Sequence, residues 1–199
     1  MPKRKRRTYH HGDLRDALIS LALETLEKSG PEELTLRGLA ERAGVSGMAP
    51  YRHFSDKTAL LRAVAARGFE ILTEDCKAVD DPGDPRKAIE AFGLAYARFA
   101  LERPGLFRLL FDGPPLLTVE EMDAKPDNLV NLLGLRLSEV VPRSRRRIAA
   151  IALHSILHGF CVLLANHRLR RMGAIDPREV VREFTAILLG GLALEMSAA

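Results

Sequence analysis

Residues 35–61 read TLRGLAERAGVSGMAPYRHFSDKTALL, and this stretch decides the fold. Thr35 offers a hydroxyl N-cap to a short helix whose inward face is apolar. Gly44 supplies the left-handed residue of a tight turn. Ser46 is placed to cap a second helix, which we expect to end at Phe54. A helix, a short glycine-containing turn and a second helix are the pattern of a DNA-binding helix-turn-helix.

The predicted second helix carries side chains suited to nucleic acid. In such units it lies in the major groove, and its N-terminal residues meet base edges. Near the expected phosphates follow the hydroxyl of Tyr51, the guanidinium of Arg52 and the imidazole of His53. The ammonium of Lys57, at the start of the next helix, can bind a phosphate. These candidates are Ser46, Gly47, Met48, Tyr51, Arg52, His53 and Lys57. Three alternatives stay open: Phe54 is core, Tyr51 packs its ring with its hydroxyl outward, and His53 is a surface histidine.

The apolar first helix, then TLRGLAERAGVS, then YRHFSDKTALL, resembles the N-terminal domain of the TetR family over residues 9–75. The resemblance implies DNA contacts, to the backbone or to base edges, by Thr35, Arg37, Tyr51, His53 and Lys57. It implies that Ser46, Gly47 and Met48 read bases. Because Gly47 and Met48 offer little hydrogen-bonding chemistry, direct readout would rest on Arg37, Ser46 and Arg52, with apolar contacts to thymine methyls.

Helical periodicity continues along the chain, and strand alternation is absent from the pattern. We therefore predict an all-α fold with an N-terminal three-helix helix-turn-helix domain, residues 1–57, and a helical ligand-binding and dimerisation domain, residues 58–199. The turn cluster at 80–85 is a further candidate boundary. The expected helices run over 13–29, 35–43, 46–54, 56–77, 85–103, 104–111, 126–141, 145–171 and 176–196.

Charge and composition narrow the class of protein. Hydrophobic residues make up 47% and charged residues 28%, which excludes a mainly disordered chain. The net charge is +4, and its excess lies in the run Lys3–Arg7. This arm either meets phosphates or is a solvated tail. Two unpaired cysteines, the lack of a signal-peptide pattern and the lack of an apolar run of membrane-spanning length predict a cytoplasmic protein without a membrane partner.

The resemblance implies that residues 80–199 sense a ligand and dimerise. The segments LERPGLFRLLF (101–111) and HSILHGF (154–160) resemble one C-terminal subgroup of the family. We expect a small, largely apolar effector in a pocket with few polar groups. The candidate ligand-binding residues are Phe92, Tyr96, Phe99, Phe107, Leu110, His154 and His158, with Phe111 and Met122 as further candidates. The alternative is that each aromatic residue is plain core.

His154 and His158 stand four residues apart, a spacing that could also chelate a metal. No third ligand is evident, so a buried polar pair without a metal is the prediction. The last two helices carry wide apolar faces, and Gly190-Gly191 costs up to about 1 kcal/mol per glycine in mid-helix. A close helix crossing would explain these glycines, which predicts a homodimer through residues 145–196.

The sequence carries no nucleophile elbow, phosphate loop, dinucleotide fingerprint or metal triad, so we expect no enzyme and no cofactor. The leading hypothesis is a ligand-responsive repressor that binds a palindromic operator in double-stranded DNA as a dimer. A transcriptional activator of the same fold and a nonspecific DNA-binding protein are the alternatives.

Overall fold

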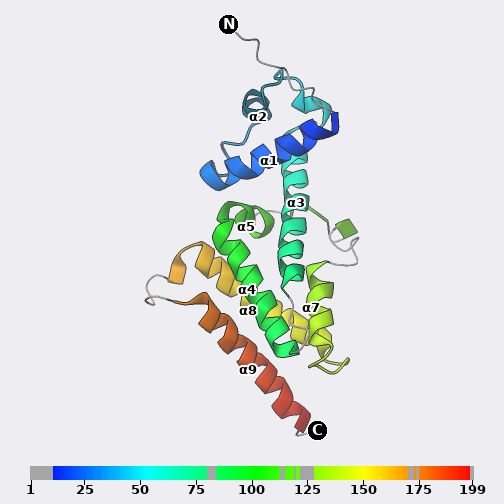
Figure 1. The fold of residues 1–199 in the computed structure, drawn as a ribbon, viewed down its shortest axis with the longest axis vertical. Coiled ribbons are helices and arrows are strands. Elements are labelled where there is room, and N and C mark those ends of the chain that lie inside the picture. Colours follow the sequence, from blue (N-terminus) through cyan, green and yellow to red (C-terminus); the bar gives the residue numbers. More distant parts are fainter. Residues whose placement is uncertain are drawn as a thin grey trace.

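A computed structural model describes residues 11–79, 84–112, 115–118, 120–121, 128–169, 173 and 175–197. Within these ranges every regular element is helical, which confirms the all-α prediction (Figure 1). The helices are α1 (His11–Ser29), α2 (Leu36–Ala43), the 3-10 helix η1 (Pro50–Arg52), α3 (Lys57–Ala78), α4 (Pro85–Glu102), α5 (Pro104–Phe111), α7 (Leu129–Leu137), α8 (Arg146–Ala165) and α9 (Pro177–Ser197). The basic arm and Met122 lie outside the described residues.

The ends of several helices follow from local signals in the sequence. Thr35 caps α2 by accepting the Gly38 N–H at 3.1 Å. Gly44 ends that helix with φ of 68°, a conformation that costs an L side chain but not glycine. Asp56 caps α3 by accepting the Ala59 N–H at 2.8 Å. This bond is the main cause of the lowered pKa of Asp56.

The second helix of the helix-turn-helix differs from the prediction. Instead of a regular helix over 46–54, the structure has turns followed by η1. The Ala49 N–H bonds to the Ser46 carbonyl and the His53 N–H to the Pro50 carbonyl, each across three residues, and only the last N–H, of Phe54, bonds across four. Pro50 has no N–H to offer Ser46 in a four-residue bond, which favours the tighter 3-10 winding.

Two helices in the second half are shorter than predicted. The helix expected over 126–141 is α7, from Leu129 to Leu137. The helix expected to reach residue 171 is α8, which ends at Ala165. His167 then adopts a positive φ of 55°, a left-handed conformation in which an α-helix does not continue. The sequence contains no glycine or proline at this point to mark the break.

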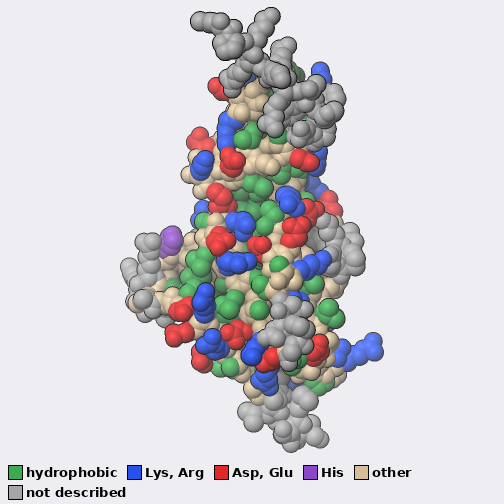
Figure 2. Space-filling model, viewed as in Figure 1, with side chains coloured by type: hydrophobic (Ala, Val, Ile, Leu, Met, Phe, Trp, Pro, Cys, Tyr) green, Lys and Arg blue, Asp and Glu red, His purple; other side chains and the backbone are tan. Residues whose placement is uncertain are grey.

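The molecule is elongated, with the helix-turn-helix at one end and α9 at the other (Figure 1). Helix α3 runs from the first part into the second, so the predicted boundary at 57/58 falls in its first turn. Helix α4 is central, packing against α3, α5, α7, α8 and α9. Its buried face includes Phe92, Tyr96 and Phe99. Figure 2 shows hydrophobic side chains between interspersed charges over the middle of one face.

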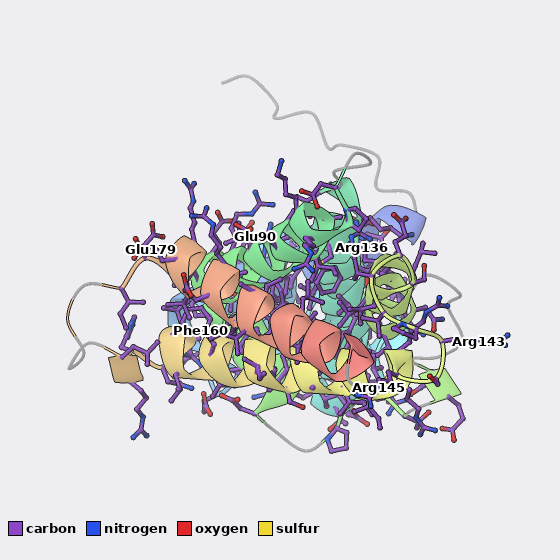
Figure 3. The ribbon with its side chains drawn as sticks, turned by 90° about the horizontal axis from the view of Figure 1, so that it is seen from below. Glu90, Arg136, Arg143, Arg145, Phe160 and Glu179 are labelled. Atoms are coloured by element: carbon purple, nitrogen blue, oxygen red, sulfur yellow. The ribbon has the colours of Figure 1, made fainter. Side chains whose placement is uncertain are left out.

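Helices α8 and α9 lie side by side, and Phe160 of α8 lies toward α9 (Figure 3). The rings of Phe160 and Phe184 meet at 6.2 Å between centroids. Contrary to our expectation of no membrane-spanning length, α8 is long and apolar enough to cross a membrane by length and composition. In the protomer 39% of its apolar window is buried. Core helices of soluble proteins have the same composition, so this property alone assigns no membrane role.

Candidate DNA-binding surface and sensor cavity

The helix-turn-helix is fixed to α1 through one arginine. Arg42, near the end of α2, donates to the Leu21 carbonyl at 3.1 Å and to the Thr25 hydroxyl. It also donates to the Glu24 carboxylate at 2.7 Å. Three acceptors on two successive turns of α1 hold the guanidinium, so α1 and α2 are positioned as one unit. Phe54 is buried beneath the recognition segment, residues 46–54, as predicted for a core residue.

The recognition segment presents its candidate residues to solvent. Met48 is 72% exposed and Tyr51 45% exposed, and Ser46, Gly47 and Arg52 are also exposed. His53 is half-buried. Arg37 of α2 lies beside Gly47, because a Cβ placed on Gly47 would be 3.8 Å from the Arg37 Cγ. The structure therefore brings Arg37 next to the first turn of the segment, where the sequence places base readout.

The side chains of two candidate residues also have hydrogen bonds within the protein. The Thr35 hydroxyl accepts the Gly38 N–H, which leaves its own O–H available as a donor. The Lys57 ammonium donates to the Glu32 carbonyl at 3.3 Å. An ammonium has three protons, so Lys57 retains donors for a phosphate. The nine candidates thus lie along α2, the recognition segment and the first turn of α3.

The second half contains a cavity of about 610 Å³, which we call the sensor cavity. Its walls come from α3, the end of α5, residues 115–117 and Glu121, the start of α7 and His154 of α8. Apolar lining dominates, with Phe69, Phe111 and Leu129 among the larger side chains. A cavity of this size can hold a small organic molecule. Among the predicted ligand-binding residues, Leu110, Phe111 and His154 line it, whereas His158 does not.

Four other predicted residues, Phe92, Tyr96, Phe99 and Phe107, are buried in the core and do not line this cavity. None of the predicted residues lies on the α3 wall, where Phe69 and Thr73 lie with Glu70, Glu74 and Lys77. The signal was available in the four-residue spacing of Ala65, Phe69, Thr73 and Lys77 and of Ala66, Glu70 and Glu74. Charged residues on a helix face are more often typical of a solvated surface.

An arginine connects the upper part of α3 to the segment that covers the cavity. Arg62 donates to the Leu116 carbonyl at 2.7 Å and to the Glu121 carboxylate at 2.6 Å. Glu121 also accepts the Thr118 N–H at 2.7 Å. The Thr118 N–H bond and, secondarily, Arg62 hold the pKa of Glu121 below its usual value. The cavity wall is thus attached to α3 close to the helix-turn-helix.

A cluster of aromatic rings and imidazoles borders the cavity, and two of its members, Phe111 and His154, line it. The Tyr96 hydroxyl and His158 Nδ1 are 3.1 Å apart and hydrogen-bonded. His154 and His158 stack at 5.7 Å between ring centroids, and Phe111 meets His158 at 4.9 Å. Burial lowers the pKa of both histidines, and His158 lowers that of His154 further. Burial also raises the pKa of Tyr96, so the cluster is uncharged near neutral pH.

His154 and His158 therefore form a partly buried polar pair. Within the part of the chain that the structure describes, no group of three or more His, Cys, Asp or Glu residues is arranged to hold a metal ion. Cys76 and Cys161 are free and buried, and burial raises the pKa of each thiol to about 12. A thiol with such a pKa is protonated and a poor nucleophile at neutral pH.

Comparison with known proteins agrees with this geometry. Residues 18–64 match the family described as "Bacterial regulatory proteins, tetR family". Residues 89–196, more than half of the chain, match "Tetracyclin repressor-like, C-terminal domain". The class C tetracycline repressor of Escherichia coli is 55% identical over 51 residues. That alignment covers 26% of this chain and 23% of the repressor, so it spans less than a quarter of that relative.

Solved structures share the whole architecture. A protein of unknown function from Rhodococcus sp. RHA1 is 32% identical, with a TM-score of 0.80, 94% of this chain covered and 100% of the other. A tetracycline repressor variant from Acinetobacter baumannii AYE, solved in complex with minocycline, is 22% identical, with a TM-score of 0.62 and coverage of 89% and 91%. The chain therefore belongs to the TetR family, with the DNA-binding helix-turn-helix of a transcriptional regulator at its N-terminus.

Proposed function

We propose that this chain is a ligand-responsive repressor that binds a palindromic operator as a homodimer. The observation that carries the proposal is the shared role of α3. This helix begins beside the recognition segment at Lys57, and its later turns form one wall of the sensor cavity. With 22 residues it spans about 33 Å. A ligand that moves its far end would change the spacing of two recognition segments in a dimer.

The dimer proposal rests on α8 and α9. Ile148 and Ile187 are each 72% exposed, and Ile151, Ile156 and Leu163 are exposed as well. A Cβ placed on Gly159, Gly190 or Gly191 would meet nothing within 4 Å among the residues that the structure describes. Helix glycines that are destabilising and unneeded within the protomer fit a surface where a second copy approaches closely. Large exposed apolar side chains gathered on two neighbouring helices are typical of an interaction surface.

The effector that we propose is small and largely apolar, as the lining of the sensor cavity favours. The minocycline complex of the Acinetobacter baumannii neighbour supports a small-molecule ligand for a chain of this fold. We also propose a cytoplasmic location, which the two free thiols and DNA as the partner support. No enzymatic role is proposed.

The first experiment selects duplexes from a random-sequence DNA library with the full-length protein. We expect a palindrome that binds in the nanomolar range and weakens steeply with salt, because phosphate contacts release counterions. Arg37→Ala should cost about 1–3 kcal/mol if its guanidinium makes a bidentate base contact. Arg98→Ala removes the same charge from the exposed face of α4 and serves as control. Equal affinity for selected and random duplexes would refute specific recognition.

A reporter gene distinguishes the sign of regulation. When the selected palindrome overlaps the promoter, repression predicts that expression falls as the protein is added. A rise in expression would instead establish the activator alternative. Calorimetry tests the regulatory role of the ligand, with a small aromatic compound that stabilises the protein as the probe. Operator DNA should weaken binding of this compound by the same factor by which the compound weakens binding of the operator. Equal affinity in both conditions would remove the regulatory role of the cavity.

A further inference from the structure

The first turn of α5 has no cap of its own. Arg103 precedes the helix and makes no side-chain capping bond, and Pro104 has no N–H. The next two N–H groups donate to one carboxylate from a distant part of the chain: Gly105 to Glu27 Oε2 at 2.9 Å and Leu106 to Glu27 Oε1 at 2.8 Å. Glu27 lies on α1, so α5 is capped by the DNA-binding part of the molecule. The negative charge also suits the positive end of the helix dipole.

The two backbones are in direct contact at this point. A Cβ built on Gly105 would lie 2.6 Å from the Leu26 carbonyl oxygen and 3.0 Å from its carbonyl carbon. Only glycine fits such an approach without a shift of the backbone. The end of α1 and the start of α5 are thus joined by a close backbone contact and by a carboxylate that binds two adjacent N–H groups.

Each of the two helices continues to a functional part. The far end of α5 carries Leu110 and Phe111, which line the sensor cavity. One turn before Glu27, α1 carries Glu24 and Thr25, which bind Arg42 of α2. Helix α5 has eight residues and is about 12 Å long. The route from the cavity to the helix-turn-helix through α5 and α1 is therefore short, and it is separate from the route along α3.

We propose that Glu27 is a positioning residue that couples the sensor cavity to the DNA-binding surface through α5. This inference rests on the proposed function. A ligand that displaces Leu110 or Phe111 moves a short rigid helix whose other end is bound to α1. The displacement either carries α1 and α2 with it or breaks the Glu27 bonds. In both cases the arrangement of the recognition segment and the state of the cavity become linked, and the link is reciprocal.

Reciprocity gives a test that needs no identified ligand. The probe is the selected operator duplex, and the measurement is amide hydrogen exchange over residues 105–111 in the free and the DNA-bound protein. We expect operator binding to change exchange there by a factor of about 5 or more, the lower end of typical coupling between sites. In Glu27→Gln, where an amide N–H₂ replaces one acceptor oxygen, this operator-dependent change should be lost.

Two further variants separate coupling from charge and from stability. Glu33→Gln removes the same charge from the DNA-binding part, where Glu33 is exposed and has no hydrogen bond or ion pair with the described residues. It should keep the wild-type response. Glu27→Asp keeps the charge but is one methylene shorter, so it should lose the response. A merely structural role would raise exchange in the free protein and leave the effect of operator unchanged.

The outcomes are distinct. Loss of the response in both Glu27 variants, with Glu33→Gln unchanged, supports the proposal. A tight operator complex without a change at residues 105–111, or with the same change in Glu27→Gln, overturns it and leaves the proposed function standing. Failure of the wild type to select any DNA sequence would overturn the proposed function, and the coupling would fall with it.

Discussion

Replacement of Gly105 by alanine tests the close contact between α1 and α5. Gly→Ala within a helix normally stabilises a protein, by up to about 1 kcal/mol. Here the new methyl group would lie 2.6 Å from the Leu26 carbonyl oxygen, so the backbones must separate. Overpacking of this kind costs about 1–3 kcal/mol. Separation also lengthens the two charge-assisted bonds to Glu27, each worth about 1.5–3 kcal/mol when fully formed.

We therefore expect a net loss of about 1–3 kcal/mol from Gly105→Ala, since the overpacking and the weakened cap outweigh the gain in helix propensity. In a chain of this size the loss lowers Tm by about 2–12 °C. Gly134→Ala in α7 is the matched control, because its Cβ would meet nothing within 4 Å among the described residues. Its Tm should stay the same or rise.

The assay is thermal unfolding followed by circular dichroism at one protein concentration, because dimerisation makes Tm depend on concentration. If Gly105→Ala raises Tm as much as Gly134→Ala does, then α1 and α5 are not in backbone contact. The Glu27 cap would then lose its geometric basis.

Three further predictions concern other parts of the molecule. Thr35→Ala removes the cap of α2 and should cost about 1 kcal/mol in denaturant unfolding; an unchanged midpoint would mean that the Gly38 N–H finds another partner. The pKa of His154 is lowered in the folded protein, so the unfolded state takes up protons first as the pH falls below about 6.5, and stability is lost there. His154→Gln should make this loss of stability less steep; a loss as steep as in the wild type would assign it to other groups. Ile151→Glu on α8 should convert a dimer to a monomer in sedimentation, whereas Leu135→Glu on α7 should not; a dimer in both would place the interface elsewhere.

The fold could be predicted where the determinants are local. Thr35 and Gly44 act on their own helix or turn, and the structure gives them the expected roles. The prediction of a regular helix for the recognition segment was wrong, because the winding of this segment depends on the lack of an N–H at Pro50. The end of α8 at Ala165 was also missed, since the reversal at His167 has no glycine or proline to mark it.

The candidate sites were harder to predict because they depend on tertiary packing. Composition does not tell which aromatic residue faces a cavity, and Phe99 and Phe107 face the core instead. The polar face of α3 looks solvated in the sequence, yet Glu70 and Thr73 line the cavity. Glu27 gave no signal, because the two N–H groups that it binds belong to residues 78 and 79 positions later.

The capping of α5 by Glu27 bears on how such regulators can be recombined. Consider a chimera that joins the DNA-binding part of one protein to the ligand-binding part of another at residue 57. Its α3 would be continuous, but its α1 and α5 would come from different proteins. If the α1 of the chimera lacks Glu27, two backbone N–H groups of α5 lose their acceptor. If its α5 has a larger residue in place of Gly105, that residue collides with the Leu26 carbonyl. The transferable unit is therefore residues 11–57 together with the Gly105-Leu106 step. Exchange of modules should succeed only between chains that match at both places.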